Sequence, residues 1–366
     1  MKKIEIKLNK QRKNYTVFVG SGILEKLSNI LNWQKYSSIY IITDENVAKL
    51  HLSGLISFLK IFLSDAQKIE TYKFPAGEKN KTLETAIKIY KDMAHFNIDK
   101  KALIINLGGG VVSDLGGFVA STFMRGLDFI NIPTTLESMV DASIGGKTGV
   151  NLNLLKNYIG VIAQPLAVVI DTRLLKTLPK RALVQGYAEV IKHGLIYSKE
   201  YFDLVAGKSP EKLEGEELIE IIEGSIKIKA DIVFQDEKEM GLRKLLNFGH
   251  TIGHAIESGS MSGTNPLFHG EAVAIGLLAE AHISKSAGMI SDEAFYIIER
   301  ALEKSGLPIR YKTGHSIEDL FDTMKKDKKN SGSHIKWTLL TSIGTADYNI
   351  EISEKFVREA ILYISR

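Results

Sequence analysis

The sequence contains no cysteine, and this absence restricts the chemistry open to its 366 residues. Without thiols there is no disulfide framework and no thiolate metal site, so a bound metal must take His, Asp, Glu or water as ligands. No apolar run approaches the roughly 18 residues of a membrane span. The first residues, MKKIEIKLNKQRKNY, also lack the apolar stretch of roughly 7 to 15 residues that marks a secretory signal. We therefore expect a soluble, cytoplasmic protein without membrane association.

The charge of the chain is weakly basic. Its 47 Lys and Arg residues stand against 43 Asp and Glu residues, which gives a net charge of +4 and a pI of about 8.8. The sequence has no arginine cluster interleaved with aromatic residues and no recognised nucleic-acid-binding motif. We expect no nucleic-acid partner, because a small anionic substrate explains the basic bias with fewer assumptions.

The two halves of the chain differ in sequence pattern. Up to residue 178, β-branched apolar runs alternate with helical patterns, and strands are expected at 39–43 and 102–107 and in FINIPTT and AVVIDT. This alternation is typical of a parallel sheet with helices on its faces. From residue 179 helical periodicity dominates, and only IKWTLLTSIG has the pattern of a strand. We expect an α/β domain over 1–178, a mostly α-helical domain over 179–366 and a site in the cleft between them.

A glycine-rich segment, INLGGGVVSDLGG, follows an expected strand and opens an expected helix. Backbone N–H groups at such a position can hold a diphosphate. The match to G-x-G-x-x-G fails at its last glycine, where Ser113 stands, so the signal is weak by itself. Asp44, at the end of an earlier strand, is a candidate for the ribose hydroxyls, for a helix cap, or for both.

The segment IGGKTG resembles the end of a phosphate-binding P-loop. The full pattern requires a glycine where Asp141 stands, so a Walker A site is rejected. Lys147 remains a candidate anion ligand, and an exposed turn lysine is the simpler alternative.

Polar residues recur within the apolar helical patterns of the second half. Glu189, Lys192 and His193 share one face of GYAEVIKHGLIYS. Such a trio costs stability unless it is exposed, paired or metal-bound. An exposed helix edge is the simplest of these interpretations.

Histidines form two further groups. His250 and His254 share a helical face in NFGHTIGHAIE, and Thr251 excludes the HEXXH protease pattern. His269 and Glu271 stand at the start of another apolar helix, in FHGEAVAIG. Histidine and carboxylate groups in a chain without cysteine favour a metal held by nitrogen and oxygen ligands. Periodicity proposes the pair His250 and His254, and it does not exclude His250 with His269.

Together these segments resemble one known family. GGGVVSDLGGF, IPTTLESMVDASIGGKTGVN, LLKNYIG, QPLAVVIDTRLLKTLP, GYAEVIKHG, LRKLLNFGHTIGHAIE and HGEAVAIG follow the order and spacing of the 3-dehydroquinate synthases over essentially the whole chain. The resemblance implies an α/β N-terminal Rossmann-like domain that binds NAD, plus a mostly α-helical C-terminal domain. It also implies a divalent metal, Zn or Co, a phosphorylated sugar acid as substrate, and a homodimer.

The resemblance also implies roles for individual residues. The metal ligands are expected to be Glu189, His250 and His269, with His254 near the substrate phosphate. The expected NAD contacts are Asp44, Glu78, Lys81, Gly110, Val111, Asp114, Thr134, Thr135, Lys147, Lys156 and Thr177. The expected catalytic and substrate-binding residues are Asp141, Lys147, Asn157, Lys192, Lys229, Arg243, Asn247, His254 and Lys328. Lys329 is adjacent to Lys328 and is an alternative to it. Arg125 is expected to reach the phosphate site of the neighbouring subunit.

The expected activity is conversion of 3-deoxy-D-arabino-heptulosonate 7-phosphate to 3-dehydroquinate and phosphate. The alternatives are a related sugar phosphate cyclase (2-deoxy-scyllo-inosose or epi-valiolone synthase), an NAD-dependent polyol dehydrogenase and an inactive NAD-binding regulator. Arg243 is expected to bind a substrate carboxylate, and this disfavours the related cyclases because their substrates lack one. The candidate phosphate-binding lysines count against a polyol dehydrogenase, which does not require them. The presence of all three expected metal ligands counts against an inactive regulator, which would be expected to lose some of them.

Overall fold

The computed structural model describes residues 1–6, 14–153, 155–261, 263, 265–311, 317–326 and 335–366. By its internal contacts the chain forms two compact units, Met1–Leu178 and Pro179–Arg366. Lys328 and Lys329 lie outside the described residues.

The N-terminal unit is built on a seven-stranded sheet in the order β1-β2-β9-β6-β5-β3-β4. All of its pairings are parallel except that of β1 with β2. The strands are β1 (Lys2–Ile6), β2 (Tyr15–Gly20), β3 (Ser38–Asp44), β4 (Lys68–Phe74), β5 (Leu103–Gly108), β6 (Asp128–Pro133) and β9 (Ala167–Asp171). The expected strands at 39–43 and 102–107 and those in FINIPTT and AVVIDT correspond to β3, β5, β6 and β9. A separate antiparallel hairpin is formed by β7 (Lys147–Leu152) and β8 (Leu155–Ile162).

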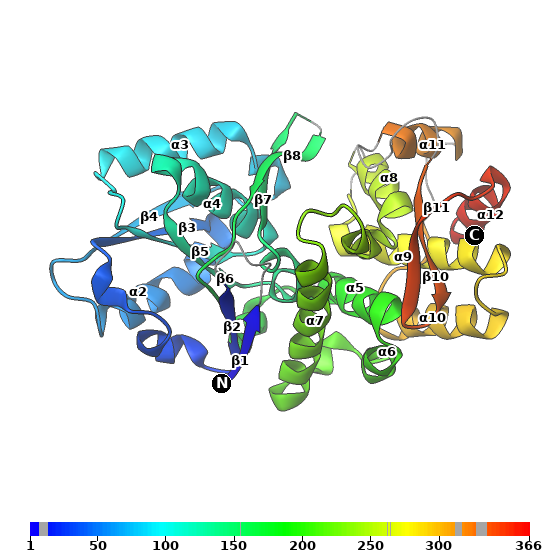
Figure 1. Ribbon diagram of the computed structural model, residues 1–366, viewed down its shortest axis with the longest axis horizontal. Coiled ribbons are helices and arrows are strands. Elements are labelled where there is room, and N and C mark those ends of the chain that lie inside the picture. The colour runs from blue at the N-terminus through cyan, green and yellow to red at the C-terminus, as the bar shows by residue number, and fades with distance from the viewer. Residues whose placement is uncertain (7–13, 154, 262, 264, 312–316, 327–334) are drawn as a thin grey trace. The chain divides into compact units, whose positions relative to one another are not determined.

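Helices cover this sheet in the manner of a Rossmann-like fold. The main helices of the unit are α2 (Ser53–Lys60), α3 (Leu83–His95) and α4 (Gly110–Thr122). Strand β3 lies between β4 and β5, so the connections from β3 to β4 and from β5 to β6 run in opposite directions across the sheet. Right-handed crossovers then place α2 on one face and α4 on the other, as Figure 1 shows.

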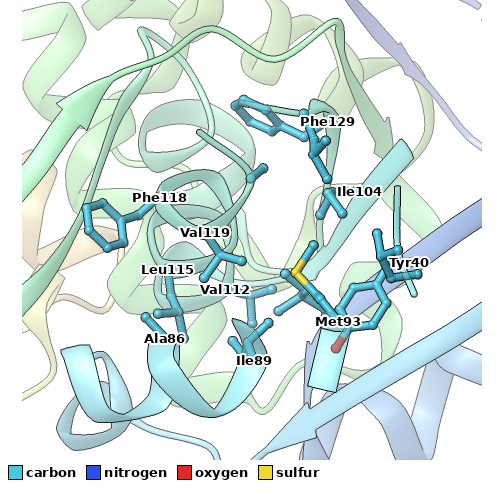
Figure 2. Packing of buried hydrophobic residues seen from close by; sticks show 14 of the residues in the cluster. Tyr40, Ala86, Ile89, Met93, Ile104, Val112, Leu115, Phe118, Val119 and Phe129 are labelled. Carbon is cyan, nitrogen blue, oxygen red and sulfur yellow. The ribbon is translucent and has the colours of Figure 1, made fainter. Parts of the chain in front are cut away.

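The core beneath α3 and α4 is apolar and closed. Ile89 of α3 and Leu115 of α4 pack with Tyr40 of β3 and Ile104 of β5, and all four are buried. Figure 2 shows this cluster, which fixes both helices on the sheet and so sets where their N-termini begin. A strand such as LIINLG can be apolar throughout because both of its faces are covered.

The C-terminal unit is organised around α9 (His269–Ser286), whose residues from Gly270 to Ser284 are all buried. A helix that is buried on every side belongs in the middle of a bundle, and Figure 1 shows α9 among its neighbours. The other helices are α5 (Lys180–Tyr197), α6 (Lys199–Val205), α7 (Gly215–Gln235), α8 (His250–Ser260), α10 (Asp292–Lys304), α11 (Ile317–Lys326) and α12 (Glu354–Ile364).

This unit also contains a β-hairpin. Strand β10 (Trp337–Ser342) corresponds to the expected strand in IKWTLLTSIG and pairs with β11 (Thr345–Ile350). The expectation of a single strand was wrong, because TADYNI lacks an apolar, β-branched run and its pairing comes from the turn at Gly344. Within the described residues, no helix combines the length and apolar character that a bilayer crossing requires.

Candidate active site and metal centre

The residues expected to contact NAD follow the carboxyl ends of the parallel strands. Asp44 ends β3 and is paired in register with Phe74, the end of β4. Gly108 ends β5 and is paired with Pro133, the end of β6. Ligands of open parallel sheets bind outside these ends, where the strand order reverses. The reversal here lies between β3 and β5, so Asp44 and the glycine loop flank the expected crevice.

The glycine loop leads directly into α4. The helix begins at Gly110, and its N-cap residue, Gly109, offers no side-chain cap. The first-turn N–H groups of Gly110 and Val111 therefore have no side-chain oxygen from the cap, and this arrangement suits an anion. Asp44 does cap a helix: its Oδ1 accepts hydrogen bonds from the N–H groups of Asn46 (2.9 Å) and Val47 (3.0 Å). The capping role is thus observed for Asp44.

Lys81 lies buried between two carboxylates near α4. Its Nζ contacts Glu78 Oε1 at 3.0 Å and Asp114 Oδ2 at 3.1 Å. Burial lowers the pKa of the Lys81 ammonium, but Asp114 and then Glu78 outweigh it, so the pKa lies above its ordinary value of 10.5. Three of the expected NAD contacts therefore form one charged cluster.

The remaining expected residues of this unit occupy loops and the hairpin. Lys147 is the exposed first residue of β7 and follows Gly145 and Gly146, both with positive φ. The other positions are Asp141 in the helical turn Ser138–Ala142, Lys156 and Asn157 in β8, Thr134 and Thr135 after β6, and Thr177 in the 3-10 helix Thr172–Thr177.

Arg125 stands in a tightly held turn. It is exposed, and its φ of +64° is flanked by +49° at Met124 and +106° at Gly126. Lys100 Nζ donates 2.7 Å hydrogen bonds to the carbonyls of Met124 and Gly126. The backbone on both sides of Arg125 is thereby fixed while its side chain faces solvent.

In the C-terminal unit, glycines let three helices approach closely. A Cβ on Gly276 of α9 would lie 1.9 Å from the carbonyl oxygen of Gly249, just before α8. A Cβ on Gly270 would lie 2.0 Å from the carbonyl oxygen of Gln185 in α5. Only glycine permits such contacts. They bring the start of α8 against the middle of α9, and the first turn of α9 against α5.

This packing gathers the residues expected to bind the metal. Glu189 Oε1 of α5 lies 3.6 Å from His250 Nε2 and 4.0 Å from His269 Nε2. His254 joins the same cluster, since ring nitrogens of His250, His254 and His269 lie within 4.8 Å of one another. Four-coordinate zinc with bonds of about 2.0 Å sets ligand atoms about 3.3 Å apart. The spacing is therefore close to that of a metal site before its ligands close on an ion.

The surroundings of the Glu189 carboxylate independently test whether this cluster suits a metal ion. It is 1% exposed, and Oε2 forms an ion pair with Lys192. Oε1 faces the histidines and has no hydrogen-bond partner within the described residues. A buried carboxylate oxygen in this state is costly unless a cation approaches it. The donor set of one carboxylate and imidazole nitrogens suits a divalent zinc or cobalt ion.

The expectation of an exposed helix edge for the α5 trio was wrong. Glu189, Lys192 and His193 are 1%, 1% and 0% exposed. His193 Nδ1 contacts Ser225 Oγ of α7 at 2.6 Å. The trio is buried because α7, α8 and α9 cover the face that it occupies. Glu271 has a structural role, as it pairs with Arg181 at 2.7 Å and caps α9.

Before α8 the chain forms a compact turn that carries Arg243. Asp236 accepts hydrogen bonds from the N–H groups of Gly241 (2.7 Å) and Arg243 (3.1 Å). The Arg243 guanidinium is buried and donates to the carbonyl of Glu237 at 2.7 Å. Asn247 donates to Glu239 at 3.0 Å. Lys229 of α7 is also buried, at 5% exposure.

Sequence reasoning missed two buried glutamates beside the expected metal ligands. Glu257 of α8 lies 3.2 Å from His269 Nδ1. Glu280 of α9 accepts hydrogen bonds from the N–H groups of Gly249 (2.6 Å) and Ile252 (3.1 Å), at the start of α8. The available signal was a single acidic residue within an apolar helical run, in GHAIESG and again in LLAEAHIS.

Comparison with solved structures shows the fold. The chain superposes on a 2-deoxy-scyllo-inosose synthase complexed with carbaglucose-6-phosphate, NAD+ and Co2+ with a TM-score of 0.89 and 23% identity, covering 98% of this chain and 99% of that one. The 2-epi-5-epi-valiolone synthase ValA from Streptomyces hygroscopicus subsp. jinggangensis, with NAD+ and Zn2+ bound, gives 0.87 and 24%, over 98% and 99% of the two chains. The chain therefore has the fold of these two synthases.

Sequence comparison is more specific. The family model described as 3-dehydroquinate synthase N-terminal matches residues 71–185, and that described as 3-dehydroquinate synthase C-terminal matches residues 186–330. A 3-dehydroquinate synthase from Desulforamulus reducens is 40% identical over 352 residues, which are 95% of this chain and 97% of that protein. The chain belongs to the 3-dehydroquinate synthase family.

Proposed function

We propose that this chain is a 3-dehydroquinate synthase, which converts 3-deoxy-D-arabino-heptulosonate 7-phosphate to 3-dehydroquinate and phosphate. The observation that carries the proposal is the buried Glu189 carboxylate, whose Oε1 faces His250 and His269. It occurs in a chain that is 40% identical, over nearly its whole length, to a relative of that name. The cofactors are NAD and a divalent metal, Zn or Co.

Glu189, His250 and His269 are the proposed metal ligands. When bound between them, the metal supplies Lewis acidity, which lowers the pKa of the substrate hydroxyls and polarises the ketone made by oxidation. Lys192 forms an ion pair with the second oxygen of Glu189 and holds the carboxylate in place. His254, beside the same cluster, is left to act on the substrate phosphate.

The N-terminal unit holds NAD in this proposal. NAD bound there would supply reversible hydride transfer, so turnover would leave no net NADH. The N–H groups of Gly110 and Val111 hold the diphosphate, and Asp44 has a second carboxylate oxygen for the ribose. The other NAD-binding residues proposed are Glu78, Lys81, Asp114, Thr134, Thr135, Lys147, Lys156 and Thr177.

Cationic residues serve the two anionic ends of the substrate. Lys147, His254 and Arg125 stabilise the phosphate as it leaves with its developing charge. Arg243 and Lys229 hold the carboxylate, for which a guanidinium fork is a good geometric match. Asp141, Asn157, Lys192, Asn247 and Lys328 complete the proposed substrate contacts. The departing phosphate accepts the proton that the elimination removes from the carbon next to the ketone. Much of the later ring closure depends on positioning.

The assembly is proposed to be a homodimer in which Arg125 reaches the phosphate site of the neighbouring subunit. The exposed side chain on a backbone held by Lys100 supports this role, because it suits a contact outside its own unit. The cytoplasmic location and the absence of a nucleic-acid partner stay predictions.

The alternative is a related cyclase that acts on a sugar phosphate without a carboxylate. The identity to solved cyclases of that kind is only 23–24%, and the buried Arg243 favours an acidic substrate. Phosphate release from the heptulosonate phosphate, measured beside glucose 6-phosphate, separates the two. We expect release from the first alone, loss after chelation, recovery with Zn or Co, and no net NADH. Release from glucose 6-phosphate alone would overturn the proposal.

A further inference from the structure

We propose that Glu257 is a positioning residue for the metal centre, and that it acts by orienting the imidazole of His269. The inference rests on the proposed metal ligands and adds the group that holds one of them. Glu257 Oε2 lies 3.2 Å from His269 Nδ1, while Nε2 of the same ring lies 4.0 Å from Glu189 Oε1. The two ring nitrogens therefore face two different carboxylates.

This arrangement selects one state of the ring. In the proposed arrangement the Glu257 carboxylate is the acceptor and Nδ1–H of His269 is the donor, because a carboxylate accepts hydrogen bonds and donates none. The neutral ring then leaves Nε2 unprotonated, with its lone pair directed toward Glu189 and the other histidines. A metal ligand needs that lone pair, and a carboxylate on the far nitrogen also raises its basicity.

His250 shows the same arrangement with a backbone group. Its Nδ1 lies 3.1 Å from the carbonyl oxygen of Phe248, and its Nε2 lies 3.6 Å from Glu189 Oε1. Both proposed histidine ligands thus present Nε2 to Glu189 and have Nδ1 against a fixed acceptor. For His250 the backbone supplies the acceptor. For His269 a side chain supplies it, and that side chain can be changed.

Glu257 occupies a buried position on the helix that also carries His250 and His254. It lies on α8 three residues after His254 and seven after His250, so the three residues share one helical face. Its carboxylate is buried at 6% exposure, where an unpaired charge would be costly. One helix therefore supplies a ligand to the metal and the group that orients the ligand of the next helix.

The test uses full-length protein stripped of metal with a chelator and titrated with Co2+. The variants are Glu257→Gln, which keeps the size but removes the charge, and Glu257→Ala. Glu299→Gln is the matched control, because Glu299 is a largely buried carboxylate of the same unit that contacts Arg310 and Tyr363 instead of a histidine. The readouts are the Kd for Co2+ and the visible spectrum of bound cobalt, neither of which requires turnover.

We expect Glu257→Gln to raise the Kd about 10-fold and Glu257→Ala to raise it by about 10- to 100-fold. The cobalt absorption bands should shift in both, and the control should match wild type. Wild-type affinity and spectrum in both Glu257 variants would overturn the inference, as would a wild-type protein that binds no Co2+. If Glu257→Ala does not fold, Glu257→Gln decides alone. Wild-type protein that binds Co2+ but releases no phosphate would refute the proposed function and leave this inference standing.

Discussion

The carboxylate of Glu280 accepts a 2.6 Å hydrogen bond from the backbone N–H of Gly249, the residue before His250. A second N–H, that of Ile252, lies 3.1 Å from the other oxygen. Glu280 is fully buried in the middle of α9. It therefore ties the N-terminus of α8, with its proposed metal ligand, to the helix that carries His269.

Replacing Glu280 with Gln should destabilise the protein. The amide keeps one acceptor oxygen, so it cannot serve both N–H groups, and it lacks the charge that favours a helix N-terminus. We expect a loss of about 1.5–3 kcal/mol in the free energy of unfolding, measured in urea on metal-free protein. A change below about 0.5 kcal/mol, the usual range for surface substitutions, would show that this carboxylate does not anchor α8.

Gly276→Ala should disturb the contact between α8 and α9. The added Cβ would lie 1.9 Å from the carbonyl oxygen of Gly249, so the helices must move apart. Overpacking of this kind costs about 1–3 kcal/mol. Gly54→Ala is the control, because nothing lies within 4 Å of a Cβ at that helical position, and it should be neutral or stabilising. Equal stability of the two variants in thermal unfolding would contradict the close approach.

The turn that carries Arg243 should depend on the ionisation of Asp236. Burial raises the pKa of this carboxyl, but the N–H groups of Gly241, Met240 and Arg243 outweigh it, so the pKa lies below 3.8. Its contribution to stability is therefore present above pH 3.8 and is lost as the pH falls through the lower, folded-state pKa.

Asp236→Asn should thus be less stable than wild type near pH 7, by about 1 kcal/mol, and the difference should shrink below pH 3.8. Urea unfolding at pH values from 7 to 3 measures it. A difference that stays constant across that range would exclude ionised Asp236 as the cause.

Arg125 can be assigned to its own or the neighbouring site by mixing inactive variants. Arg125→Ala and Lys147→Ala should each abolish most phosphate release as homodimers. If Arg125 acts across the interface, a mixed dimer has one site with both Lys147 and Arg125 intact. We expect dissociation and reassociation of the two variants to restore up to half of the wild-type activity per mixed dimer. No recovery, with mixed dimers shown to form, would place Arg125 in its own subunit's site.

The fold followed from local sequence pattern where a segment's own residues determine its structure. SIYIITD and LIINLG are β-branched, apolar runs buried on both faces, and they form β3 and β5. The strand TADYNI mixes three residues that strands favour (Thr, Tyr and Ile) with three that they disfavour (Ala, Asp and Asn), and it pairs with β10 across a hairpin turn. Such a strand has no signal strong enough to identify it in isolation.

The candidate site was only partly accessible to the same reasoning. Helical spacing placed His250 and His254 on one face, and the structure brings both to the cluster that also contains His269. Whether Glu189 is exposed depends on helices α7, α8 and α9, which begin 26 to 80 residues later in the sequence, so its burial could not be predicted from α5 alone. Glu257 was missed for the same reason, because its partner His269 belongs to the next helix.

The central claim is that Glu189, His250 and His269 hold the metal and that His254 does not. The direct measurement is the metal content per chain of His269→Ala and His254→Ala after loading with Zn2+ and gel filtration. The account predicts that the first variant retains almost no zinc, and that the second retains one ion per chain while its phosphate release falls. Full zinc occupancy in His269→Ala, or loss of zinc in His254→Ala, would contradict it.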